Sequence, residues 1–290
     1  MVLTKKFTIS SPAKINLYLK FFKKRNNNLH EIESLVSHIS LFDKIEISNS
    51  KKTRVNFFGK FSNLISSHDN SVIKILNILK KKNKKIKNKN FLIKVFKNIP
   101  VGAGLGGGTS NAVSILFFLI KKFKLKLGKK VMNDLLNQIG TDSYNFINPY
   151  SKILYGTGTK FKLFKSKINL NLLLIFPNIP NYTKEIYVLN NNFSVKNRSN
   201  IYIKNFCKDK FKFLKTNQND LLEAAQKNNP RIKNLMIFIK KKQFSNLIQM
   251  SGSGSCCYVV FKNKKNLLKC QKFVKKQYKS YWTAVVKTIK

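Results

Sequence analysis

The residues with the clearest chemical potential lie in one loop, PVGAGLGGGTS, residues 100–110. Five of the chain's twelve glycines fall between Gly102 and Gly108. Glycine lets the backbone adopt positive φ and lets an anion come close to successive N–H groups. A helical pattern begins near Thr109, so the unpaired N–H groups of a helix N-terminus add to the attraction. The loop therefore predicts a phosphate site, where Thr109 or Ser110 donates a hydroxyl or caps the helix.

Two common phosphate motifs do not fit this loop. A P-loop needs a lysine directly after its last glycine, and Gly108 is followed by threonine. A dinucleotide fingerprint can be placed on Gly102, Gly104 and Gly107, but no early strand–loop–helix unit or ribose-binding acidic residue supports it. The phosphates of a nucleotide are favoured, and a flexible loop without a ligand is the alternative.

A carboxylate beside such a phosphate site could act as a general base. The chain has only eleven acidic residues. Asp43 and Glu46 lie in a patterned strand, Asp134 lies within an amphipathic helix, and Asp209 lies in a lysine-rich stretch. Only Asp142, in GTDSYNF, follows a helix end, where a loop can direct it into a cleft. Its alternative role is the N-cap of the next short helix.

Polar residues on one strand face give a second set of candidates. In AKINLYLKF, residues 13–21, Lys14 and Asn16 share one face, and apolar side chains fill the other. A lysine in such a basic chain is usually a solvated surface charge, and His30 is likewise typical of a surface. MSGSGS, residues 250–255, is either a flexible turn or a second source of backbone N–H groups.

The elements that position these residues follow from hydrophobic periodicity. Alternation predicts strands over 13–21, 41–47, 53–58, 91–96 and 171–176. Helical spacing predicts helices over 71–80, 109–123, 131–140, 216–227 and 231–247, and then a closing helix and strand. This irregular mixture predicts an α+β protein of two lobes with a boundary near 155–165.

The charge balance is unusual, because 57 Lys and Arg against 11 Asp and Glu give a formal net charge of +46. Such a surface attracts polyanions at low salt. No recognition signature accompanies the lysines, so we expect compositional drift and no specific nucleic-acid partner. The four cysteines form no C-x-x-C pair and suit reduced packing residues. No apolar segment is long enough to cross a bilayer, so we expect a soluble, cytoplasmic protein without a membrane partner.

Three motifs in order resemble the GHMP kinase superfamily. PVGAGLGGGTSNA is similar to its ATP-binding signature, and SPAKINLYL and MSGSGS are similar to its first and third motifs. Within the superfamily, residues 12–35 and the segments IGTDSYNFI and TNQNDLLEAA are most similar to the family of 4-diphosphocytidyl-2-C-methyl-D-erythritol kinases. The resemblance covers residues 8–262.

This resemblance implies a two-lobed GHMP kinase fold. Its N-terminal α/β nucleotide-binding domain would cover residues 1–162 and its C-terminal ferredoxin-like α+β domain residues 163–290, with the active site in the cleft between them. It implies ATP and Mg²⁺ as cofactors and phosphorylation of a cytidine diphospho-sugar alcohol in non-mevalonate isoprenoid synthesis. Neither the resemblance nor the spacing assigns protein ligands to Mg²⁺ or an oligomeric state.

The resemblance also assigns roles to individual residues. Asp142 and Lys14 would be catalytic, and Asn16, His30, Thr183 and Tyr187 would bind the substrate. The ATP-binding residues would be Pro100, Val101, Gly102, Ala103, Gly104, Leu105, Gly106, Gly107, Gly108, Thr109 and Ser110. Leu29 departs from the family's usual tyrosine before the histidine, which predicts a one-sided aromatic clamp on cytosine and weaker cytidine binding. Homoserine-type or mevalonate-type kinases, and a basic RNA-binding protein, are the alternatives.

Overall fold

The computed structural model of the chain describes residues 5–24, 30–66, 69–194, 199–245 and 247–289. The chain forms two compact units built from interleaved segments. Unit 1 comprises Met1–Ala13, Leu41–Val101 and Gly106–Asn148, and unit 2 comprises Lys14–Ser40, Gly102–Leu105 and Pro149–Lys290. Strands β1 (Phe7–Lys24) and β2 (His30–Asn49) each contribute to both units. The predicted α+β class is confirmed, and the division into consecutive domains at residues 162 and 163 stays a prediction.

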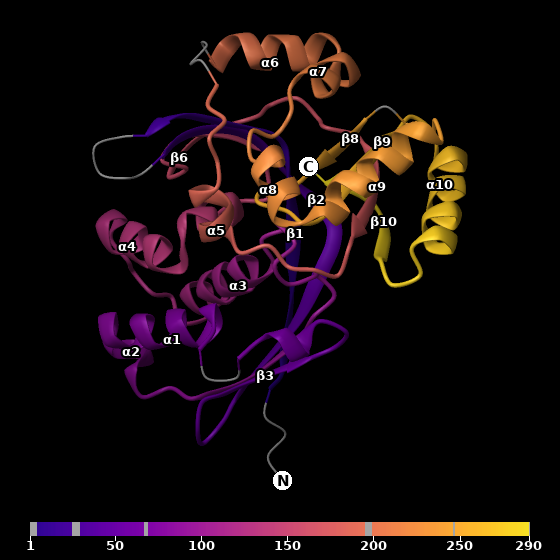
Figure 1. Ribbon diagram of the computed structural model, residues 1–290. Coiled ribbons are helices and arrows are strands. Elements are labelled where there is room, and N and C mark those ends of the chain that lie inside the picture. Colours follow the sequence, from indigo (N-terminus) through magenta and orange to yellow (C-terminus); the bar gives the residue numbers. More distant parts are fainter. Residues whose placement is uncertain (1–4, 25–29, 67–68, 195–198, 246, 290) are drawn as a thin grey trace. The chain divides into compact units, whose positions relative to one another are not determined.

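Unit 1 combines a small sheet with a group of helices (Figure 1). Strand β4 pairs antiparallel with the second half of β2 and parallel with β3. Helices α1, α3 and α4 pack against one another. Besides parts of β1 and β2, the elements are β3 (Arg54–Phe58), η1 (Ser62–Leu64), α1 (Ser71–Lys82), α2 (Lys84–Lys87), β4 (Phe91–Phe96), α3 (Gly107–Lys122), α4 (Lys129–Ile139) and η2 (Thr141–Phe146).

Helix α1 shows how the sequence sets the helices of unit 1. The Asn70 side chain accepts hydrogen bonds from the N–H groups of Val72 and Ile73, which caps the first turn. The apolar side chains at positions 72, 75, 76 and 79 lie on one face and are buried, as their spacing predicts. Helix α3 begins two residues before its predicted start, because the Ser110 N–H already donates to the Gly106 carbonyl at 2.9 Å.

A buried ion pair supports the chain that enters the glycine loop. The Lys97 ammonium donates to an Asp43 carboxylate oxygen, and both side chains are at most 2% exposed. The other Asp43 oxygen accepts from the N–H groups of Asn98 at 2.7 Å and Ile99 at 2.9 Å. Burial lowers the pKa of Lys97, and the Asp43 charge opposes that change. The pair thereby fixes the backbone just before Pro100.

Unit 2 is built on an antiparallel sheet. Strand β2 pairs with β5 through residues 32–36 and with β10 through residues 38–39, and the sheet continues in the order β10–β7–β9–β8. Strand β6 pairs with β5. Its elements are β5 (Lys152–Gly156), β6 (Lys160–Leu163), β7 (Asn171–Phe176), α5 (Thr183–Val188), α6 (Ser199–Lys208), α7 (Lys210–Thr216), α8 (Leu222–Asn228), α9 (Pro230–Lys241), β8 (Ile248–Met250), β9 (Cys257–Phe261), α10 (Lys264–Gln277) and β10 (Trp282–Ile289).

The core of unit 2 joins helices α8, α9 and α10 to the sheet (Figure 1). Alternate side chains of β7 and β9, such as Leu173 and Val259, are buried against apolar side chains of the helices, such as Leu235 and Leu267. Their burial supplies the main favourable free energy of this unit. Cys257 and Cys270 belong to this core, Cys256 is also buried, and Cys207 is exposed. Burial raises the pKa of Cys257 and of Cys270 to about 12, so these thiols pack as neutral groups.

The predicted helix over 216–227 is confirmed only in its second half, as α8, because the chain breaks between Thr216, the end of α7, and Leu222, the start of α8. The Asn219 side chain oxygen accepts the Leu221 N–H at 3.0 Å. Its amide donates to the carbonyls of Met250 at 3.0 Å and Gly252 at 2.7 Å. An asparagine that bonds nearby backbone groups competes with helix formation, which explains the break. Helices α5 and α6 and strands β5 and β6 were not predicted.

Lys152 is a lysine buried in the sheet of unit 2. Its side chain is 1% exposed, and its ammonium lies 5.4 Å from the centre of the Phe161 ring. Burial lowers the pKa of Lys152 to about 7, because the charged form loses its hydration.

We expect Lys152→Met to raise the free energy of unfolding at pH 7 by about 2–4 kcal/mol. Unfolded Lys152 keeps a proton up to its ordinary pKa of about 10.4, so the native protein gains stability from pH 7 to that value. The advantage of the variant should therefore shrink as the pH rises through this range. Denaturant unfolding of both proteins at pH 7 and pH 10 measures this difference in the free energy of unfolding. Lys162→Met, at an exposed lysine, is the control. If the native protein were more stable than the variant at pH 7, burial of Lys152 would not cost stability, and the prediction would be wrong.

Among the described residues, no helix combines the length and the apolar character that crossing a bilayer requires.

Candidate active site

The three motifs singled out from the sequence meet in unit 2. The Lys14 N–H donates to the Leu105 carbonyl at 3.0 Å, which joins the start of the polar strand face to the glycine loop. The Ser251 hydroxyl donates to the Gly104 carbonyl at 3.0 Å, which joins the loop to the turn at 250–255. Segments separated by more than 80 residues in the sequence thus share one set of hydrogen bonds. This convergence is the central feature of the candidate site.

Lys14 and Asn16 form a buried polar pair within this convergence. Their side chains are 2% and 6% exposed, so Lys14 is not the solvated surface charge that was the alternative. The Lys14 ammonium donates to the Asn16 side-chain oxygen at 2.7 Å, and the Asn16 amide donates to the Ser34 hydroxyl at 2.8 Å. The Asn16 backbone N–H donates to the Ser251 hydroxyl at 3.3 Å. These bonds fix the direction of the ammonium group.

The turn at 250–255 is packed rather than flexible. A Cβ atom on Gly252 would lie 3.1 Å from the Lys14 ammonium nitrogen and 3.1 Å from the Gly104 carbonyl oxygen. The two bonds from the Asn219 amide hold the backbone of this turn. The hydroxyls of Thr183 and Ser253 lie 3.0 Å apart, which adds the start of α5 to the same group.

His30 lies within an aromatic group of unit 2. The centres of the His30 and Tyr187 rings are 6.2 Å apart and the rings are nearly perpendicular, at 86°. The Phe21 ring contacts both, at 5.5 Å from His30 and 5.0 Å from Tyr187. The structure therefore brings together the two residues predicted to bind a nucleobase. Leu29 lies outside the described residues.

Asp142 lies in unit 1, in the first turn of η2. Gly140 is the N-cap of this 3₁₀ helix, and no side chain caps it, so the alternative role of Asp142 as N-cap is wrong. The Asn145 amide donates weakly to an Asp142 carboxylate oxygen at 3.4 Å. The Asp142 side chain is exposed, so its carboxylate is accessible for chemistry.

The N-terminus of α3 forms the other part of the phosphate motif in unit 1. Gly106 is the N-cap with a φ of 71°, and no side chain caps this helix. The N–H groups of the first turn have no partner within the helix. Gly107 is closely packed, because a Cβ atom added there would lie 2.9 Å from Ile99 Cγ2 and 3.2 Å from the Lys97 ammonium nitrogen. The Ser110 hydroxyl accepts from the Ser11 hydroxyl at 2.7 Å.

The predicted site residues are thus divided between the two units. Unit 2 holds Lys14, Asn16, His30, Gly102, Ala103, Gly104, Leu105, Thr183 and Tyr187. Unit 1 holds Pro100, Val101, Gly106, Gly107, Gly108, Thr109, Ser110 and Asp142. The supporting residues Ser34, Asn219 and the Asp43–Lys97 pair were not predicted. Nothing in the local sequence signalled them, since Asn219 lies in the polar run NQND and Ser34 follows Glu33.

Comparison with known proteins identifies the family. Residues 70–147 match the family described as GHMP kinases N terminal domain. Over 285 residues, the chain is 39% identical to the 4-diphosphocytidyl-2-C-methyl-D-erythritol kinase of Pelagibacter ubique strain HTCC1062, covering 98% of this chain and 99% of that one. The chain belongs to the 4-diphosphocytidyl-2-C-methyl-D-erythritol kinase family.

Solved structures agree on the fold of this kinase family. A crystal structure of 4-(cytidine 5'-diphospho)-2C-methyl-D-erythritol kinase has a TM-score of 0.76 and 19% identity, covering 97% of this chain and 99% of that one. A mevalonate kinase from L. major in complex with R-mevalonate has a TM-score of 0.69 and 12% identity, covering 98% and 97%. The predicted GHMP kinase fold is confirmed. Because both sequence identities are below 25%, these two structural similarities establish the fold only, and the substrate does not follow from them.

The described residues of this kinase contain no group of three or more His, Cys, Asp or Glu side chains that could hold a metal ion. Mg²⁺ commonly keeps several waters and binds through one or two carboxylates and the phosphates of a nucleotide. An Mg²⁺ ion that arrives with ATP would need no such group.

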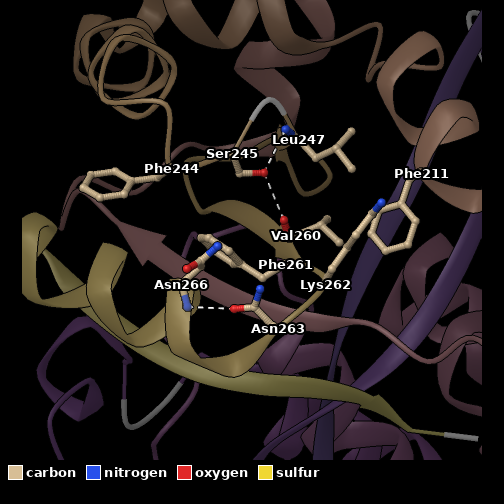
Figure 2. Close-up of a pocket in the computed structure, with 9 residues that line it drawn as sticks. All are labelled: Phe211, Phe244, Ser245, Leu247, Val260, Phe261, Lys262, Asn263 and Asn266. Carbon is tan, nitrogen blue, oxygen red and sulfur yellow. Dashed lines mark hydrogen bonds between the residues drawn. The ribbon is translucent and has the colours of Figure 1, made fainter.

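A pocket of about 290 Å³ also lies in unit 2, and none of the predicted residues lines it (Figure 2). Its polar groups bond among themselves: the Ser245 hydroxyl donates to the Val260 carbonyl at 3.0 Å, and the Asn263 side chain accepts the Asn266 N–H at 2.9 Å. The Lys262 ammonium lies 5.3 Å from the centre of the Phe211 ring. None of these contacts points to a ligand.

Proposed function

We propose that this protein transfers the γ-phosphoryl group of ATP to the 2-hydroxyl of 4-diphosphocytidyl-2-C-methyl-D-erythritol. The products are the 2-phosphate and ADP, a step of non-mevalonate isoprenoid precursor synthesis. The observation that carries the proposal is the convergence of Lys14, Asn16, the glycine loop and the turn at 250–255 in a member of this kinase family. We also propose that the family's division into domains at 1–162 and 163–290 applies, and that the protein is cytoplasmic.

The glycine loop and the start of α3 are proposed to bind the phosphates of ATP. Backbone N–H groups in a loop with positive φ, followed by a helix N-terminus, favour a bound anion. Loop residues 102–105 are tied to Lys14 and Ser251, so the cradle is ordered before the nucleotide arrives. When bound, Mg²⁺ offsets part of the phosphate charge. The net charge of +46 further raises the local concentration of anionic substrates.

Asp142 is proposed to accept the proton of the 2-hydroxyl. An aspartate with an ordinary pKa of about 3.9 is already ionised at neutral pH. Lys14 is proposed to stabilise the developing alkoxide or the transferred phosphoryl group. Its bond to Asn16 keeps the ammonium oriented, so no reorganisation is needed during the reaction.

The cytidine end of the substrate is proposed to bind at His30 and Tyr187. The two rings already lie in one aromatic group, which gives a flat base an apolar surface. Thr183, at the start of α5 and 3.0 Å from the Ser253 hydroxyl, is proposed to contact the diphosphate. Leucine at position 29 offers no ring for stacking, so weaker cytidine binding than in relatives stays a prediction.

The choice of acceptor is tested by initial rates of ADP release with three alcohols. We expect 4-diphosphocytidyl-2-C-methyl-D-erythritol to be turned over at least about 10³-fold faster, as kcat/KM, than homoserine or mevalonate. Turnover of either of those in its place would assign the protein to another GHMP activity. Saturable, sequence-selective RNA binding at physiological salt, without kinase activity, would instead support the RNA-binding alternative.

A further inference from the structure

A third aromatic side chain, Phe193, lies on the His30 ring. The two ring centres are 5.9 Å apart and the planes are inclined by only 22°, so the rings are offset-stacked. Phe193 is 43% exposed, whereas the other rings of this group are at least partly buried. An exposed aromatic face next to a candidate base-binding histidine is available to a flat ligand.

Phe193 is held in place by an ordered segment between α5 and α6. The N–H of Ser194 donates to the Phe21 carbonyl at 2.7 Å, which docks the segment on the end of β1. The Ser194 hydroxyl donates to an Asp220 carboxylate oxygen at 2.7 Å. Asp220 also accepts from the Phe21 N–H at 2.9 Å and from the Lys20 ammonium at 3.1 Å.

A second set of bonds orders the chain just before Phe193. The Asn190 amide donates to the Asn192 carbonyl at 3.0 Å, and its side-chain oxygen accepts the Asn192 N–H at 3.3 Å. Asn190 itself is buried. A turn of this kind fixes the backbone that presents Phe193. The Phe193 ring is therefore exposed on a segment whose backbone is held by hydrogen bonds.

We propose that Phe193 is a specificity-determining residue whose exposed face stacks on the nucleobase, while Tyr187, nearly perpendicular to the His30 ring, contacts the edge of the base. This inference rests on the proposed function, because it takes cytosine as the base bound at His30. Phe193 then supplies the stacking ring that a leucine at position 29 cannot offer. The ligand chemistry is a pyrimidine nucleoside diphosphate.

The test measures cytidine binding and phosphoryl transfer in native protein and in Phe193→Leu. We expect the Kd for cytidine diphosphate, measured calorimetrically without ATP, and the KM for 4-diphosphocytidyl-2-C-methyl-D-erythritol to rise about tenfold. The KM for ATP and kcat should not change. Phe193→Tyr should restore native values, because tyrosine keeps the ring.

Phe273→Leu is the matched control, since Phe273 is 41% exposed, lies on α10 of the same unit and also contacts a neighbouring ring. Native affinity for cytidine diphosphate in Phe193→Leu would overturn the inference and leave the proposed function intact. Absence of both cytidine diphosphate binding and turnover in the native protein would instead overturn the proposed function and, with it, this inference. A Phe193→Trp variant gives an independent readout, because stacking of cytidine diphosphate should quench its fluorescence beyond any change at Trp282.

Discussion

Asp142→Asn is expected to lower kcat by about 10³-fold while the protein keeps its affinity for ATP and for the cytidine substrate. Asparagine has nearly the same shape as aspartate but cannot accept the proton of the substrate hydroxyl. Asp142 is exposed in the first turn of η2, so the substitution should not disturb the fold. Steady-state ADP release and calorimetric binding of an ATP analogue measure the two quantities separately.

Asp134→Asn is the matched control for this variant. Asp134 lies on α4 of the same unit, its side chain is 43% exposed, and it forms a long ion pair to Lys82 at 3.8 Å. We expect native rates from it. A near-native kcat in Asp142→Asn would show that another group takes the proton, and equal losses in both variants would point to a general effect of charge.

Gly104→Ala is expected to lower kcat/KM by about 10²-fold and to destabilise the protein by a few kcal/mol. Gly104 has a φ of +72°, and a Cβ atom there would lie 2.0 Å from the Ser251 carbonyl oxygen. It would also lie 3.0 Å from the Gly254 nitrogen. Because both neighbours are backbone atoms, the loop and the turn at 250–255 must separate, and the phosphate cradle loses its support.

Gly128→Ala serves as the control for Gly104→Ala. Gly128, the N-cap of α4, has a φ of −66°, and no atom lies within 4 Å of its added Cβ. The Tm of the Gly128→Ala variant and its KM for ATP should match those of the native protein. A Gly104→Ala variant with native Tm and native KM for ATP would contradict the tight packing of the loop.

Much of the fold followed from periodicity where one face of an element is buried. Strands β4 and β7 were predicted to the residue, since apolar runs bounded by polar residues mark them clearly. Helix α6, which is only ten residues long, was not predicted. The helix predicted over 216–227 starts only at Leu222, because the Asn219 amide bonds to the carbonyls of Met250 and Gly252, which local spacing does not reveal.

The site was predictable in its motifs but not in its supports. Three glycine-containing or polar motifs indicated which segments matter, and unit 2 brings Lys14, Asn16, Gly104 and Ser251 into one hydrogen-bonded group. Burial of Lys14 was not visible in a chain with 57 Lys and Arg, because one lysine among many looks solvated. Phe193 stacks on His30 although the two residues are more than 160 positions apart in the sequence, so no local pattern could predict this contact.

The central claim is that phosphate is transferred to one defined hydroxyl, and phosphorus NMR of the product tests it most directly. Purified protein is incubated with ATP, Mg²⁺ and 4-diphosphocytidyl-2-C-methyl-D-erythritol, and ADP is measured in parallel. Carbon 2 carries a methyl group and no hydrogen, so we predict one new phosphomonoester signal without proton splitting, equal in amount to the ADP formed. ADP release without this signal, or a phosphomonoester split by a neighbouring proton, would contradict the account.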